Sequence, residues 1–92
     1  MDDEQRAYKD LDRASKAEAL LSNDMLMDAF KHIDSELIER WRSCKDQEGR
    51  DRIWQATQIA ARVQEILKMV LQNGKIAKRI IDDLEGKRRK AA

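Results

Sequence analysis

Apolar residues recur every three or four positions along most of this chain, and that spacing is what most constrains its fold. From Leu26 to Cys44 the steps are four, three, four, four and three, which places those side chains on one face of a helix. The same spacing returns from Ile53 to Leu71, after the polar stretch KDQEG at 45–49. The sequence contains no proline, the strongest helix breaker. The pattern therefore predicts an all-α chain built around a helical hairpin.

Local signals divide the chain into three to four helices. The first is expected at about 2–21, and the second follows the capping residues of SNDM and spans about 25–43. Asp46 suits the N-terminus of a long central helix at about 46–72. Asn73-Gly74 is typical of a left-handed helix end, so a short fourth helix is expected at 75–85. We predict a hairpin or small bundle in one domain, 1–92.

The two ends of the chain are less constrained than its middle. The apolar stripe of segment 1–21 is narrow and rich in alanine. We therefore expect this helix to be stable only when it packs against other helices. It either packs on the hairpin or extends to another chain. Residues 86–92 begin with Gly86 and continue as KRRK, and they are expected to form a flexible basic tail.

The central helix has an apolar face broader than one partner helix needs. Ile59, Val63 and Ile66 follow one seam, and a neighbouring seam lies beside it. The helix is therefore either central in a bundle or in contact with another chain. The two tryptophans flank the turn, and we predict that they pack across it and close the hairpin. An exposed pair that forms a binding hot spot is the alternative. The predicted core or interface residues are Trp41, Ile53, Trp54, Ile59, Val63, Ile66, Leu67 and Val70.

Positive charge gathers at the C-terminal end, although the net charge is only +1. Three readings of this basic end stay open: a solvated end, a weak salt-dependent contact with nucleic-acid phosphates, or a dock for an acidic protein surface. No groove-reading motif accompanies it. The predicted partner-binding residues are Lys75, Lys78, Arg79, Lys87, Arg88, Arg89 and Lys90.

This sequence contains few residues that could form a catalytic or metal-binding site. His32 is the single histidine, and its helical neighbours four residues away are acids, so a solvated surface position is expected. Cys44 is the single cysteine, which excludes an internal disulfide and suits a reducing compartment. One His and one Cys make no zinc-ligand spacing. We expect neither an enzyme nor a cofactor.

Met1 is followed by DDE, unlike a standard signal peptide, and no apolar stretch approaches a membrane span.

Three stretches resemble a group of small helical proteins encoded by tailed bacteriophages. They are RASKAEALLSNDMLMDAF (13–30), KDQEGRDRIWQA (45–56) and VLQNGKIAK (70–78). That group shares an EALL opening, a polar turn of the RDxEGRExLW type and a closing NGKLA-like segment. The chain departs from it at the turn, where Lys45 replaces the usual arginine. The resemblance implies a phage origin and a place in the bacterial cytoplasm or the virion, and it carries no activity.

Taken together, these features favour a helical interaction protein of phage particle assembly. Such a protein would self-associate and dock on a larger phage protein. Its charge layout is similar in type to that of small head-scaffolding proteins, which end in a basic helical tail. The alternatives are a small subunit that binds or packages DNA and an inhibitor of a host protein. No membrane contact and no small-molecule substrate are expected.

Overall fold

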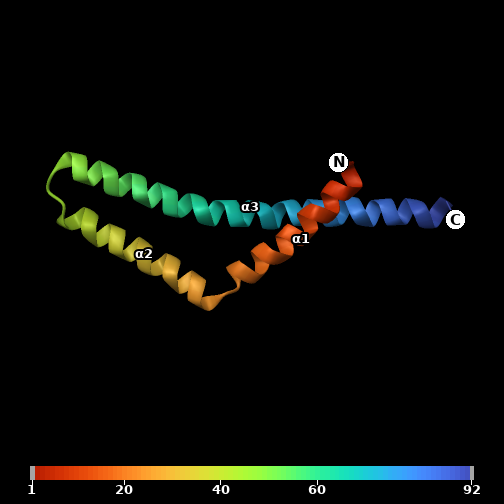
Figure 1. The fold of residues 1–92 in the computed structure, drawn as a ribbon, viewed down its shortest axis with the longest axis horizontal. Helices are drawn as coiled ribbons and strands as arrows, with labels where there is room; N and C mark the ends of the chain where they lie inside the picture. Colours follow the sequence, from red (N-terminus) through yellow and green to blue (C-terminus); the bar gives the residue numbers. More distant parts are fainter. Residues whose placement is uncertain (1, 92) are drawn as a thin grey trace. The chain divides into compact units, whose positions relative to one another are not determined.

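A computed structural model describes residues 2–91, and within this range it is all-α. The three helices are α1 (Asp3–Leu21), α2 (Asp24–Ser43) and α3 (Gln47–Ala91), as Figure 1 shows. They belong to two compact units. The crossing unit comprises Met1–Leu20 with Leu67–Ala92, of which 2–20 and 67–91 are described, and the hairpin unit comprises Leu21–Ile66. None of the described helices has the length and apolarity needed to cross a bilayer.

Helices α1 and α2 begin where the sequence predicts, because side chains there satisfy free backbone N–H groups. The Asp2 carboxylate accepts a hydrogen bond from the backbone N–H of Gln5 at 2.8 Å. The Asn23 side chain accepts one from Leu26 at 2.9 Å. The bounds of both helices agree with the predicted ones to within one residue.

Helix α3 begins as predicted but does not end as predicted. The Asp46 carboxylate accepts the N–H of Gly49 at 2.7 Å and so caps the first turn. The predicted end after Gln72 is wrong, because the helix continues through Asn73 and Gly74, and the predicted fourth helix is part of α3. No glycine in the described chain has a positive φ, so neither Gly74 nor Gly86 forms a left-handed cap. Residues 86–91, predicted as a flexible tail, continue the helix.

The crossing unit holds the buried core, and that core consists of small residues. Ala7 of α1 is buried against Ala77 and the larger Ile81 of α3, with Leu11 packed beside them. Ala14 and Ala17 of α1 are buried as well. Gly74 is buried as well, and a Cβ on it would lie 2.0 Å from the Cβ of Ala14. The two helices thus approach too closely for any side chain at this position. Residues 3–20 of α1 therefore pack on the C-terminal part of α3.

In the hairpin unit, α2 runs antiparallel to the first part of α3 (Figure 1). Residues facing the partner helix are half-buried, and none of the unit's 46 described positions, 21–66, is fully buried. Two antiparallel helices alone leave most of their side-chain surface in water. The half-buried apolar residues include Leu26, Phe30, Leu37, Ile53, Ala56 and Ala60.

Candidate interaction surfaces

An apolar groove lies between α2 and α3 in the hairpin unit, and we call it the tryptophan groove. It has a volume of about 370 Å³. Trp41 comes from the last turns of α2 and Trp54 from the second turn of α3, so both tryptophans of the chain lie in its walls. Their exposed fractions are 42% and 59%. The groove is lined by Leu37, Ile38, Trp41, Arg42, Trp54 and Thr57.

One arginine lines this groove, and a second stacks on one of its wall residues. The Arg50 guanidinium stacks over the Trp41 ring, 3.7 Å from its centroid. Arg42 lies in the wall and donates to the Glu39 carboxylate at 3.2 Å, a contact in which both side chains are exposed. The sequence predicted that the tryptophans close the hairpin, with an exposed pair as the alternative. In the structure both line the groove and both remain exposed. The stacking of Arg50 on Trp41 was not predicted.

A second apolar surface follows α3 in the hairpin unit, and we call Ile59, Val63 and Ile66 the isoleucine seam. Their exposed fractions are 67%, 45% and 42%. The sequence predicted these residues as core or interface. In the structure the neighbouring residues Ile53 and Leu67 are half-buried instead, as is Val70. The seam therefore does not form a core within the chain, which leaves the interface reading open.

The predicted basic residues of the crossing unit are exposed, and they have different neighbours. Arg88 donates to the Glu4 carboxylate at 2.5 Å, and Glu4 raises the pKa of this arginine through that hydrogen bond. Lys75 and Lys78 border a groove of about 400 Å³ together with Glu18 of α1. The acids Asp82, Asp83 and Glu85 lie between these lysines and the KRRK segment. Arg79, Lys87, Arg89 and Lys90 are exposed.

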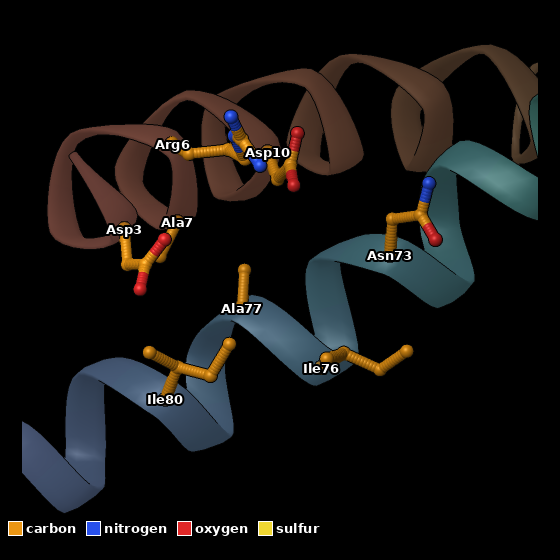
Figure 2. A pocket seen from close by; sticks show the side chains of 8 residues that line it. All are labelled: Asp3, Arg6, Ala7, Asp10, Asn73, Ile76, Ala77 and Ile80. Atoms are coloured by element: carbon orange, nitrogen blue, oxygen red, sulfur yellow. The ribbon is translucent and has the colours of Figure 1, made fainter. Parts of the chain in front are cut away.

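On another side of the same helix pair, a groove of about 410 Å³ has an apolar floor and charged walls. Figure 2 shows Ile76 and Ile80 of α3 below Asp3, Arg6 and Asp10 of α1. Ala7 and Ala77 face one another at the bottom, where the two helices approach. Both isoleucines remain 40% exposed or more. The groove offers apolar contact area, with acidic and basic groups placed on one wall.

The turn between α2 and α3 is held by the carboxylate of Asp46. Besides the Gly49 N–H, this group accepts from the Cys44 thiol at an S–O distance of 3.4 Å. The hydrogen bond from Gly49, followed by that from Cys44, lowers the pKa of Asp46. A Cβ on Gly49 would lie 2.7 Å from the Cys44 sulfur, so glycine keeps room for this arrangement. Cys44 therefore takes part in the hydrogen bonds that hold the turn at the end of α2.

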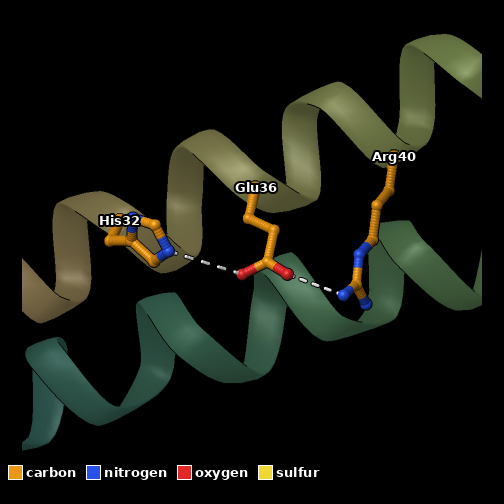
Figure 3. Close-up of polar contacts among 3 residues, drawn as sticks. All are labelled: His32, Glu36 and Arg40. Carbon is orange, nitrogen blue, oxygen red and sulfur yellow. Dashed lines mark hydrogen bonds and ion pairs between the residues drawn. The ribbon is translucent and has the colours of Figure 1, made fainter.

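Five titratable groups of α2 take part in surface ion pairs: His32, Glu36, Glu39, Arg40 and Arg42. Figure 3 shows Glu36 between His32 and Arg40, with N–O distances of 3.9 Å to the histidine and 2.6 Å to the arginine. The His32 side chain is 81% exposed, as the sequence predicted. Across residues 2–91, no three His, Cys, Asp or Glu side chains lie close enough together to hold a metal ion.

Comparison with known proteins found no matching family model, no similar curated protein and no similar solved structure.

Proposed function

We propose that this chain is a helical interaction protein that self-associates through its hairpin unit and docks on a larger protein. The proposed setting is particle assembly of a tailed bacteriophage, and it rests on the sequence resemblance alone. Self-association and docking rest on the distribution of apolar surface in the hairpin unit.

One observation carries the proposal: the hairpin unit has no buried side chain yet exposes eight large apolar ones. Each of them keeps between 42% and 79% of its surface exposed to water. Covering large apolar side chains with a partner is favourable, so this exposed surface suits contact with other proteins. The eight residues are Met25, Ile33, Ile38, Trp41, Trp54, Ile59, Val63 and Ile66.

The isoleucine seam is the part of this surface that suits a second copy of the chain. Its steps of four and three residues keep the three side chains within about 60° of one another on the helix. A narrow apolar seam on one helix is what helices use to pair in bundles and coiled coils. Two hairpins joined along their seams form a four-helix arrangement in which each copy covers the other.

Solution mass by light scattering tests self-association. We expect a mass of at least twice the 10.8 kDa of one chain, falling as the protein is diluted. Ile59→Asp places a charge in the seam, so it should give the monomer mass and keep the helical circular dichroism. Gln58→Asp is the matched control, because it adds the same charge at the adjacent exposed position. A monomeric wild type, or equal effects of the two variants, would reject the seam.

A role in DNA binding is the second candidate, because eight basic residues stand against three acids in 67–92. Phosphate contacts made by such residues weaken steeply with salt. The same light-scattering series with duplex DNA at two salt concentrations separates the two functions. A mass increase that disappears at high salt and on removal of 87–90 would favour DNA binding. A mass indifferent to DNA at low salt would exclude it.

A further inference from the structure

The tryptophan groove has the chemistry of a docking site for a helix of another protein. We propose that it binds an acidic amphipathic helix of a partner, whose apolar side chains enter between Trp41 and Trp54 while a carboxylate binds Arg50. This inference deepens the docking half of the proposed function and names the surface and the class of partner. It is independent of self-association through the isoleucine seam.

The shape of the groove fits side chains from a helix. Its volume of about 370 Å³ accommodates two apolar side chains of leucine or phenylalanine size, the number that one helical turn presents at positions i and i+3 or i+4. The walls come from two antiparallel helices of the same unit, so a third helix can lie along them. Tryptophan and arginine are the residue types most enriched where protein interfaces gain their affinity.

Arg50 gives the groove its preference for an acidic partner. Stacking on Trp41 holds the guanidinium in place, which lowers the entropy lost when it binds a carboxylate in bidentate geometry. Within residues 2–91, no carboxylate lies within ion-pair distance of Arg50, although four other arginines of the hairpin unit have one. Arg42 in the groove wall is already paired with Glu39, so the unpaired positive charge at the groove is that of Arg50. Charge complementarity therefore selects an acidic helix over a basic one.

The groove is separate from the seam used for self-association. Val63 is nine residues beyond Trp54, so at 100° per residue the two side chains point to opposite sides of α3. None of the three seam residues lines the groove. A second copy bound to the seam therefore leaves the tryptophans accessible to another protein.

Intrinsic fluorescence measures groove occupancy directly, because Trp41 and Trp54 are the only tryptophans in the chain. The probes are two synthetic 18-residue helical peptides with the same leucine stripe. One carries glutamate at the remaining positions and the other carries lysine. We expect the glutamate peptide to shift emission to shorter wavelength, to reduce quenching by acrylamide, and to bind at least tenfold more tightly than the lysine peptide.

Variants assign the binding to the groove. Arg50→Gln should reduce the preference for the glutamate peptide to less than about threefold, a loss on the scale of one charged contact. Arg52→Gln is the matched control, since this arginine is exposed on the same helix and already paired with Glu48 at 2.6 Å. Trp54→Ala should abolish binding, whereas Ile59→Asp should leave it unchanged even though that variant is expected to be monomeric. Circular dichroism checks that each variant remains helical.

Several outcomes would overturn the proposal. These are equal binding of the two peptides, no emission shift with either, and equal effects of Arg50→Gln and Arg52→Gln. A shift of emission on dilution without peptide would also reject it, because the groove would then be occupied by a second copy. Failure of self-association together with normal peptide binding would reject the seam and leave the groove proposal intact.

Discussion

The crossing unit and the hairpin unit use opposite kinds of residue for helix packing. The crossing unit buries alanines and a glycine, with Ile81 as its one large buried side chain. The hairpin unit contains the larger share of bulky apolar residues, including both tryptophans, and buries none of them. Burial in this chain follows how closely two helices approach and does not follow how hydrophobic their residues are.

This difference separates the roles of the two units. Small residues allow backbones to approach, and dispersion contacts between nearby helices then accumulate without any protruding side chain. Large side chains keep helices apart and fill the intervening space only when a third or fourth helix supplies the other wall. The crossing unit therefore buries its core within one helix pair. The hairpin unit needs a partner to bury its large apolar side chains.

Gly74→Leu should have the largest effect, because it fills the closest point of the crossing. Even a single Cβ at this position would lie 2.0 Å from that of Ala14. We expect a loss on the order of 4 kcal/mol in the free energy of unfolding, above the usual cost of overpacking because both contacting atoms lie next to backbone. Amide hydrogen exchange would show lost protection throughout α1.

Gly86→Ala is the matched control for this prediction. Gly86 also lies within α3, but a Cβ on it would meet nothing within 4 Å. Its replacement should stabilise the protein by about 0.5–1 kcal/mol through helix propensity alone. If both glycine variants changed stability by similar amounts, close approach of α1 and α3 would not be what holds the crossing unit together.

Ile81→Ala and Ile59→Ala compare one residue type in the two environments. Ile81 is 7% exposed in the crossing unit and Ile59 is 67% exposed in the hairpin unit. Urea unfolding of dilute protein, followed by circular dichroism, should show a loss of about 2–4 kcal/mol for Ile81→Ala. The change for Ile59→Ala should stay within about 0.5 kcal/mol. An equal loss at both positions in dilute protein would mean that the hairpin unit has a core of its own.

The extent of α3 shows why part of the fold could not be predicted. Periodicity and capping residues located α1, α2 and the start of α3, because those signals act within one helix. Asn73-Gly74 was read as a helix end, whereas Gly74 makes room for Ala14, sixty positions earlier in the chain. Glycine serves both purposes, and only the position of the other helix distinguishes them. The matching signal was the seven-residue spacing of Ala7 and Ala14 on α1.

The candidate surfaces were predictable in composition but not in orientation. Spacing identified Ile59 and Ile53 as members of adjacent apolar seams, and nothing local indicated which seam would face α2. The structure turns the Ile53 side inward and leaves Ile59 exposed. The stacking of Arg50 on Trp41 depends on the path of the turn, so no local sequence signal indicates it.

Asn23→Ala tests the hairpin unit at its other end. The Asn23 side chain accepts the Leu26 N–H at 2.9 Å and caps α2. Its loss should cost about 1 kcal/mol, measured by tryptophan fluorescence during urea unfolding, since both tryptophans lie in this unit. Ser22→Ala is the control, because the adjacent exposed hydroxyl does not cap the helix. Equal losses from the two variants would argue against the cap.

The smallest expected effect is the acid dependence of the turn. Hydrogen bonds from Gly49 and then Cys44 lower the pKa of Asp46 below the value of about 3.9 for an unfolded chain. A lowered pKa means that the charged carboxylate stabilises the folded state. Its contribution is fully present above about pH 4 and is lost as the pH falls through the lower, folded-state pKa.

Asp46→Asn removes this titration and keeps an oxygen that can accept the Gly49 N–H. We therefore expect the variant to be slightly less stable than wild type at pH 7, with the difference shrinking below about pH 4. Tryptophan fluorescence during urea unfolding at pH 7, 4 and 3 measures it, with Asp51→Asn, one turn further along α3, as the control for general charge effects. A difference that stayed constant with pH would show that Asp46 acts only as a neutral cap, and the hairpin unit would then owe none of its acid sensitivity to its turn.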